Sequence, residues 1–451
     1  MSWIQFLPAL LKGAEVTAVI AVVSTLLGAA MAFIIGIARV EGGPILSRIA
    51  LFYIEFMRGV PLLVKFFWLY YALPLIGLSL DPITTGIAGL VLNISAYGAE
   101  VVRGGLQSVP DQQHEAARAL NFSKSYTLVH ICLPQALVEM MPVLRQSRCP
   151  EPEGHGARFP DLDHGSHLPG PAAAQHHAQQ HACLHADAHR LFRDGARARD
   201  GDAPDRTQAQ ARRGFPEGRA RMIYGFAYDT SSTLAYALSI LPILGIGLIV
   251  TIEAALVGFG IALVLGLVWC LLRRSRFTAL SWTIAAIVEF IRDTPLLVQL
   301  FFLYYVLPDY GVTLPAFLTG ALALGLQYSA YTSEVYRGGF DAVPRGQWEA
   351  ATALNLTRYQ VYRDIVVPQA IPRILPSMGN YAVSMLKETP VLSVVTVLDM
   401  LNLANMIGDR TFEYLVPLSL VGLIFPIMTT LCSFGIHALE RALPKAGLAL
   451  R

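Results

Sequence analysis

The chain has 451 residues, of which 54% are hydrophobic and 15% are charged, and its mean hydropathy is +0.49. This composition excludes a disordered chain and an ordinary soluble domain, in which about a quarter of the residues are charged. The 34 Lys and Arg residues nearly balance the 32 Asp and Glu residues, so charge predicts no nucleic-acid partner. The apolar residues form long runs, which predict an all-α polytopic membrane protein.

Eight apolar runs are long enough to cross a bilayer, which takes about 20 helical residues. We expect membrane spans at residues 13–38, 49–74, 84–106, 247–272, 280–307, 315–337, 375–398 and 412–438. Lys and Arg are frequent after the first and third spans of each half and absent from 75–84 and 308–315. Because these residues favour cytoplasmic loops, the loop after each third span is predicted to be cytoplasmic.

The two halves are parallel repeats separated by a fixed offset of 234 residues. Residues 55–74 match residues 289–308 at 13 of 20 positions. The correspondence predicts a first repeat at 1–142 with about three spans and a second at 222–451 with about five. Equivalent residues that keep the offset include Glu100 and Glu334, Glu115 and Glu349, and Pro134 and Pro368.

Residues 143–221 fit neither repeat, and two expected helices are missing there. Residues 146–221 contain no Ile, Val, Lys or Tyr but hold 8 of the 11 His. One interpretation is a disordered linker, and another is a metal sensor in which His181, His185 and His189 share a helix face. The favoured interpretation is out-of-frame translation of GC-rich DNA, because the missing residue types include those with A/T-rich codons.

The loop after the third span carries the same motif in both repeats. A short helix of strong helix formers is followed by a turn at Asn, which tolerates left-handed geometry, and by a second helix that leads through Pro to the membrane. Small Ala side chains allow another protein to approach closely, so the loop is predicted to be a docking hairpin. Its candidate residues are Glu115, Ala116, Ala117, Asn121 and Pro134, and Glu349, Ala350, Ala351, Asn355 and Pro368.

These loops resemble the EAA motif of type I ABC importer permeases, whose transmembrane domain has the MetI-like fold. The surrounding pattern is similar to the branch that transports polar amino acids, with Phe-Met/Ile-Arg-x-x-Pro-Leu-Leu-Val and Leu-Lys-Glu-Thr-Pro-Val-Leu-Ser. The resemblance covers 1–142 and 222–451. Asn121 and Asn355 stand where the family usually has Gly. These paired Asn positions and the opening residues 224–229 also look similar to permeases for ectoine or hydroxyectoine.

The resemblance implies a multi-pass permease in the bacterial inner membrane that moves a polar amino acid or an amino-acid-like compatible solute, such as ectoine, into the cytoplasm. Its partners would be cytoplasmic ABC ATPase subunits, an extracytoplasmic solute-binding protein, the lipid bilayer and a second permease subunit. The sequence has no Gly-x4-Gly-Lys-Ser/Thr motif, so no catalytic residue, metal or cofactor is expected here. An ion-coupled secondary transporter or channel with parallel repeats is the alternative.

Ionisable residues inside spans are candidates for function. Four Glu/Arg pairs at i, i+3 are predicted to form ion pairs near helix ends, namely Glu55/Arg58, Glu100/Arg103, Glu289/Arg292 and Glu334/Arg337. Lys387, Glu388 and Thr389 interrupt the fourth span of the second repeat just before Pro390, which predicts a broken helix beside the substrate pathway. Further pathway candidates, which could instead serve only packing, are Tyr328, Ser329, Tyr331 and Glu334.

Overall fold

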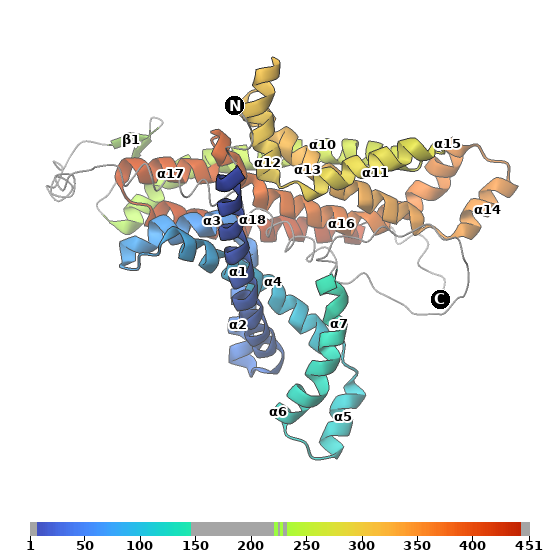
Figure 1. The fold of residues 1–451 in the computed structure, drawn as a ribbon, viewed down its shortest axis with the longest axis horizontal. Coiled ribbons are helices and arrows are strands. Elements are labelled where there is room, and N and C mark those ends of the chain that lie inside the picture. Colours follow the sequence, from blue (N-terminus) through green and yellow to red (C-terminus); the bar gives the residue numbers. More distant parts are fainter. Residues whose placement is uncertain (1–6, 146–220, 224–225, 229–231, 443–451) are drawn as a thin grey trace. The chain divides into compact units, whose positions relative to one another are not determined.

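The computed structural model describes residues 7–145, 221–223, 226–228 and 232–442 (Figure 1). The segment predicted to be aberrant, 143–221, therefore lies almost entirely outside the described residues. Within the described residues, the regular elements are helices apart from a short antiparallel hairpin of β1 (Arg221–Ile223) and β2 (Phe226–Tyr228). Two compact units make up the structure: residues 1–58 with 86–185, and residues 59–85 with 186–451.

In the first unit, α1 (Leu7–Glu41) packs against α4 (Pro82–Gln107) through small residues two helical turns apart. A side chain added at Gly28 would meet Ile94 at 2.7 Å, and one added at Gly36 would meet Val102 at the same distance. Small residues let helix backbones approach closely in a bilayer, where van der Waals packing drives association. Residues 59–85 of the first repeat belong to the second unit. The other elements of this repeat are α2 (Pro44–Gly59), α5 (Asp111–Ala119), α6 (Lys124–Tyr126), η4 (Thr127–Cys132) and α7 (Leu133–Arg145).

In the second unit, the long helix α10 (Thr233–Arg273) packs along α13 (Ala316–Asp341), and α11 (Thr278–Asp293) packs against both (Figure 1). Gly258 repeats the small-residue contact, since an added side chain would lie 3.1 Å from Leu324 on α13. The unit is completed by α16 (Val367–Glu388), α17 (Met400–Thr411) and α18 (Leu415–Ala442). It also includes residues 59–85 of the first repeat, of which α3 (Leu62–Phe67) and η2 (Trp68–Ala72) pack against α18.

Two spans that were predicted as continuous helices, 49–74 and 280–307, are each broken before a proline. The helix of the second repeat ends at Asp293, and Thr294 is extended with φ −85° and ψ 125° before Pro295. Proline lacks the N–H of the helix ladder and disfavours helical geometry at the preceding residue, which explains the break. The chain then continues through α12 (Leu296–Phe301), η5 (Phe302–Val306) and η6 (Leu307–Tyr310).

The first repeat has the same order of short helical segments, because it carries prolines at the equivalent positions. After Pro61 come α3, η2 and η3 (Leu73–Ile76), and the segment stops at Gly77 with φ 94°. The equivalent Gly311 has φ 83°, a conformation that glycine adopts at little cost.

The predicted span 375–398 is also not one helix. It begins earlier, as α16 at Val367, and α16 ends at Glu388, where the 3-10 turn η8 (Thr389–Val395) begins. The segment Arg358–Val395 meets α17 at a bend of 46°. The end of α16 at Glu388, just before Thr389 and Pro390, confirms the broken helix expected there, whereas the 46° bend lies further along the chain, between Val395 and Met400. The prediction of 247–272 was too short, because α10 starts 14 residues earlier and contains Pro242.

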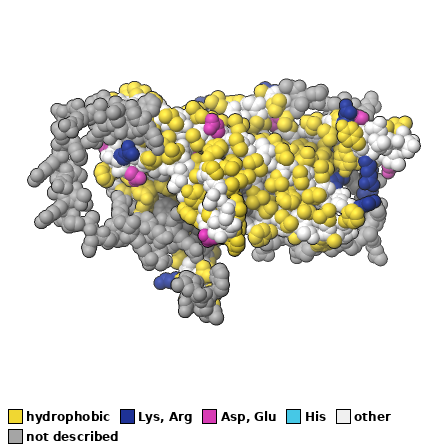
Figure 2. All heavy atoms as spheres, turned by 90° about the horizontal axis from the view of Figure 1, so that it is seen from above, with side chains coloured by type: hydrophobic (Ala, Val, Ile, Leu, Met, Phe, Trp, Pro, Cys, Tyr) yellow, Lys and Arg dark blue, Asp and Glu magenta, His cyan; other side chains and the backbone are white. Residues whose placement is uncertain are grey.

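Four described helices are long and apolar enough to cross a membrane, and up to six spans result if each bent pair counts as one. Hydrophobic side chains cover most of the visible face of the described helices in Figure 2. Lys and Arg gather at the end where α14 (Arg345–Ala353) and α15 (Arg358–Gln360) lie (Figures 1 and 2). This distribution fits helices in lipid with a basic cytoplasmic end.

Candidate functional site

A helical hairpin with a left-handed asparagine lies after the third span of each repeat. In the second repeat Asn355 has φ 54°, its N–H donates to the carbonyl of Thr352 at 2.9 Å, and the N–H of Leu356 donates to that of Ala351 at 3.1 Å. These two bonds close the end of α14 as in a Schellman motif. The first repeat has the same pattern around Asn121, at φ 56°. The predicted turn at Asn is therefore confirmed in both repeats.

The helix after each turn begins at a hydroxyl cap. Thr357 accepts from the N–H of Gln360, whose side chain accepts from the N–H of Thr357, which completes a capping box. Ser123 accepts from the N–H of Tyr126 in the first repeat. The chain then runs through the π-helical turn η4 or η7 (Val361–Val366) to α7 or α16. Each hairpin is thus fixed locally by its own hydrogen bonds.

The hairpins expose the same positions. Glu349 and Ala350 are exposed while Ala351 is buried, and the first repeat repeats this order at residues 115–117. The sequence analysis missed a leucine at the tip of each hairpin, Leu120 and Leu354, with 66% and 72% of their surface exposed. A leucine at the equivalent position of two otherwise polar loops could have identified both residues from the sequence. We call the exposed Glu, Ala and Leu of each hairpin its docking face, which comprises Glu115, Ala116 and Leu120, and Glu349, Ala350 and Leu354. Pro134 and Pro368 are also exposed, at the start of the helices that return to the membrane.

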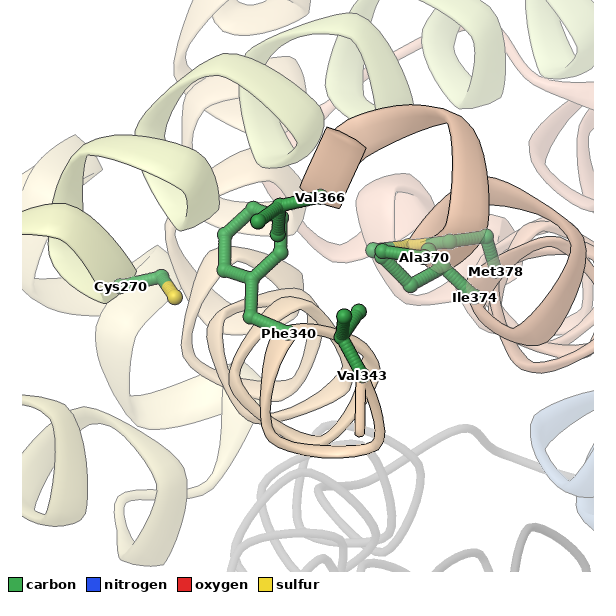
Figure 3. Close-up of a cluster of buried hydrophobic side chains, with 7 residues drawn as sticks. All are labelled: Cys270, Phe340, Val343, Val366, Ala370, Ile374 and Met378. Atoms are coloured by element: carbon green, nitrogen blue, oxygen red, sulfur yellow. The ribbon is translucent and has the colours of Figure 1, made fainter. Parts of the chain in front are cut away.

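The second hairpin rests on a buried apolar cluster at the ends of α10, α13 and α16 (Figure 3). Trp348 of α14 packs edge to face on Tyr362 at 5.5 Å, and Tyr362 packs in the same way on Phe340 of α13 at 6.0 Å. Through this cluster, α14 is connected by side-chain packing to α10, α13 and α16. The cluster consists of Cys270, Phe340, Val343, Val366, Ala370, Ile374 and Met378.

The first hairpin rests on an equivalent but less aromatic cluster. His114 stands where the second repeat has Trp348, and its Nε2 lies 3.7 Å from the thiol of Cys132. Burial raises the pKa of the Cys132 thiol, which keeps it protonated and unreactive at neutral pH. The cluster members are Val102, Leu106, Val109, Cys132, Ala136 and Met140.

Ion pairs form within and between the helices, and those that join α10, α13 and α16 lie near the second hairpin. All four predicted i, i+3 pairs form. The structure adds a contact that the sequence pattern did not reveal, since Arg273 at the end of α10 also pairs with Glu334 of α13. Arg274 pairs with Asp341, and Arg373 of α16 donates to the carbonyl of Ala342. The charged groups therefore join α10, α13 and α16 at the same end as the cluster.

Among the pathway candidates, Tyr328, Tyr331 and Glu388 come together deep in the second unit. The ring of Tyr331 lies 6.0 Å from that of Tyr328 and 5.5 Å from that of Tyr381 on α16. The hydroxyl of Tyr328 faces the carboxylate of Glu388. Both groups are buried, and within the described residues neither the hydroxyl nor either carboxylate oxygen has a hydrogen bond of normal geometry.

The other pathway candidates lie elsewhere. Ser329 accepts a hydrogen bond from the indole N–H of Trp269 on α10 at 3.1 Å. Glu334 belongs to the ion pairs with Arg273 and Arg337. Thr389 donates to the carbonyl of Leu386 at 2.8 Å, so its hydroxyl caps the broken end of α16.

Two residues near Glu388 were missed. Tyr381 lies seven residues before Glu388 on α16, a spacing that puts both on one helix face and could have identified it. Lys65 of α3 is 5% exposed and lies close enough to the half-buried Lys387 for their charges to interact. No local pattern links Lys65 and Lys387, because they are 322 residues apart in the sequence.

No group of three or more His, Cys, Asp or Glu that could hold a metal ion occurs in the described part of the chain. His181, His185 and His189 lie outside the described residues.

Comparison with known proteins places these features in context. The sequence profile described as "Binding-protein-dependent transport system inner membrane component" matches residues 24–147 and 258–445. A probable amino-acid ABC transporter permease of Sinorhizobium fredii, y4tG, is 57% identical over 231 residues, which are 51% of this chain and 100% of that protein. A second one from the same strain, y4tF, is 45% identical over 148 residues, which are 32% of this chain and 62% of that protein. The chain thus spans less than two thirds of y4tF.

Among solved structures, one described as an amino acid ABC transporter with histidines is 35% identical in sequence. The match covers 48% of this chain and 100% of that one, with a TM-score of 0.45.

Proposed function

The chain belongs to the family of binding-protein-dependent transport system inner membrane components, and we propose that it carries a polar amino acid or a similar zwitterion into the cytoplasm. Members of this family are multi-pass permeases of the inner membrane and not enzymes. The relatives named above are described as amino-acid permeases, which supports the general class of solute. Ectoine or hydroxyectoine is the narrower proposal, and it rests on residues 224–229 and on the paired Asn121 and Asn355 of the sequence.

The single observation that carries this proposal is the docking face present on both hairpins. Exposed Glu, Ala and Leu stand at equivalent positions on two hairpins that capping bonds fix and apolar clusters support. An exposed leucine at a fixed tip offers apolar area to a pocket on a partner, and the neighbouring alanine allows close approach. We propose that each face binds a separate ATPase subunit and passes its closure into α10, α13 and α16 or their first-repeat equivalents. A solute-binding protein delivers the solute from outside.

The proposed pathway includes the buried group around Glu388. A carboxylate removed from water and lacking normal hydrogen bonds is a site for the ammonium of a zwitterion. Lys387, next to it at the break of α16, would attract the carboxylate of the same solute. Glu388→Gln keeps the shape and removes the charge, so uptake should fall while basal ATP hydrolysis by the assembled transporter remains. The matched control is Glu413→Gln, an exposed glutamate outside the site, and equal uptake by both variants would exclude Glu388 from the pathway.

The domain organisation is a further proposal: two permeases, 1–142 and 222–451, joined through an aberrant segment at 143–221. The y4tG match accounts for a complete permease within about half of this chain, whereas the y4tF match covers only 62% of that protein. We propose a frameshift that replaced the last third of the first permease. Sequencing the gene tests this, because alternative frames over 143–221 should encode two apolar helices; an absence of such helices in every frame would contradict it.

Vanadate-sensitive uptake is the experiment that tests the transport function. Proteoliposomes that contain the permease, its ATPase subunits and the solute-binding protein should accumulate a labelled amino acid only with ATP inside, and vanadate should stop the accumulation. An ion-coupled secondary transporter is the second candidate. It would accumulate solute along an imposed ion gradient without ATP, and this result would replace the proposal.

A further inference from the structure

The break between α11 and α12 leaves backbone carbonyls without their helical donors. In an unbroken helix the carbonyl of Ile291 would accept from the N–H of residue 295, but this residue is a proline and has no N–H. The carbonyls of Arg292 and Thr294 also lose their helical partners, because the backbone is extended at Thr294. A buried carbonyl without a donor costs free energy, so the break needs donors from elsewhere.

Two side chains supply these donors. The amide nitrogen of Gln299 on α12 donates to the carbonyl of Ile291 at 2.8 Å and to that of Thr294 at 3.0 Å. The hydroxyl of Tyr331 on α13 donates to the carbonyl of Arg292 at 3.3 Å. Gln299 and Tyr331 therefore satisfy all three carbonyls, and we call these two donors the clamp of the break.

Gln327 on α13 links the two residues of the clamp. Its amide lies within hydrogen-bond distance of the Gln299 amide on one side and of the Tyr331 hydroxyl on the other. Gln299 and Gln327 are 8% and 2% exposed, so water is largely excluded from these bonds. Within the described residues the amide oxygen of Gln299 has no hydrogen bond, so the bonds of this side chain are those that its nitrogen donates.

The clamp reaches the buried group around Glu388. The ring of Tyr331 stacks on that of Tyr381 and lies beside that of Tyr328, whose hydroxyl faces the carboxylate of Glu388. The helix α12 also packs against η8, which begins where α16 is broken. Through Tyr331, the clamp at the first break is therefore in contact with the rings beside the carboxylate at the second.

We propose that Gln299 is a positioning residue for transport, which acts through Tyr331 to hold the rings beside Glu388 in place. The inference rests on the proposed function, in which Glu388 lies on the solute pathway. The first repeat supports it, because its break at Pro61 is followed at the same spacing by another donor, Lys65, which is 5% exposed. An amide or an ammonium can donate to carbonyls, whereas an apolar side chain cannot.

Amide hydrogen exchange in nanodiscs and uptake in proteoliposomes test the proposal on the full chain, assembled with its ATPase subunits and the solute-binding protein. Gln299→Leu keeps the approximate size of the side chain and removes the donor. Because buried carbonyls then lack a partner, exchange over 296–306 should become about tenfold faster, while the equivalent segment 62–72 stays unchanged. The apparent KM should rise by a comparable factor for labelled glutamine, arginine or ectoine, whichever the wild type accumulates best. Thr283→Val is the control, because it removes a hydrogen bond to Ala279 elsewhere on α11 and should change neither quantity.

A rescue variant and a double variant complete the test. Gln299→Lys restores a donor, the one that stands at the equivalent position of the first repeat, so slow exchange and the wild-type KM should return. Equal losses in the lysine and leucine variants would overturn the donor role. Tyr331→Phe keeps the ring and removes the other donor, so it should also raise KM, and it carries the prediction if Gln299→Leu fails to assemble. Because Gln299 acts through Tyr331, the double variant should raise KM little further, and full additivity would overturn the proposal.

The two measurements separate this inference from the transport function. Unchanged exchange in Gln299→Leu would show that no clamp exists, and faster exchange with an unchanged KM would show that the clamp positions nothing on the pathway; either result overturns the proposal. A wild-type chain without ATP-driven uptake would instead refute the transport function, and the positioning role with it, while the exchange measurement would still show whether the clamp holds the break.

Discussion

Two adjacent glycines in α13 offer a direct test of how the helices below the second hairpin pack. A Cβ added at Gly339 would overlap the side chain of Ile374 on α16, whereas one added at Gly338 would meet nothing within 4 Å. The first repeat has the same arrangement: a Cβ at Gly105 would lie 2.6 Å from Met140, and one at Gly104 would be free. The prediction is that alanine at the two neighbouring positions has opposite effects.

The magnitude follows from two opposing terms. Alanine favours a helix over glycine by about 0.8–1.0 kcal/mol, and this is the only term at Gly338. At Gly339 the added methyl group also overpacks the contact with Ile374, which costs about 1–3 kcal/mol. The two variants should therefore differ in stability by about 1–3 kcal/mol, with Gly338→Ala the more stable.

The assay is the apparent melting temperature of each purified variant in lipid nanodiscs, followed by size-exclusion chromatography after heating. Gly339→Ala should lose several degrees relative to Gly338→Ala, and Gly105→Ala should do the same relative to Gly104→Ala. Equal melting temperatures within either pair would refute the close packing of α13 on α16 or of α4 on α7.

Three further predictions concern the hairpins and the start of α4. Asn355→Gly should leave stability nearly unchanged, while Asn355→Ala should cost about 1–2 kcal/mol because alanine resists φ 54°; thermal melting of both variants distinguishes them. Trp348→Ala should lower solute uptake by weakening the anchor of α14, with a loss of about 2 kcal/mol for a half-buried Trp, and Trp348→Phe should restore uptake. At Asp81, hydrogen bonds from the hydroxyl and N–H of Thr84 and the N–H of Ile83 hold the pKa of the carboxyl below its ordinary value. The stabilisation is therefore complete above about pH 4 and is lost as pH falls through the lowered pKa. The difference in melting temperature between the wild type and Asp81→Asn should shrink below pH 4, and a constant difference would contradict this.

Much of the local structure could be predicted from the sequence, because its causes are local. The left-handed Asn121 and Asn355, the caps at Ser123 and Thr357, and the i, i+3 ion pairs each depend on residues within one or two turns. The helix breaks at Pro61 and Pro295 had an equally local cause. They were missed because the apolar run continues across the proline, and its length was taken as one span.

The tertiary relations could not be predicted in the same way. Nothing near Trp68 in the sequence indicates that its partner is Ser419, 351 residues away. The same holds for Arg273, which pairs with Glu334 across two helices, and for Lys65 beside Lys387. The repeat offset was the one long-range signal in the sequence, and it shows which surfaces are equivalent without showing what covers them.

The measurement that tests the central claim most directly is ATP hydrolysis stimulated by the solute-loaded binding protein, measured together with uptake for hairpin variants in proteoliposomes. Lysine at both docking faces, Glu115→Lys with Glu349→Lys, should abolish uptake and stimulated hydrolysis while the binding protein keeps its affinity for the solute. Glu413→Lys, an exposed change away from the hairpins, should retain both activities. Full stimulated hydrolysis and full uptake by the Glu115→Lys and Glu349→Lys variant would contradict the account, because the docking faces would then carry no force from the ATPase.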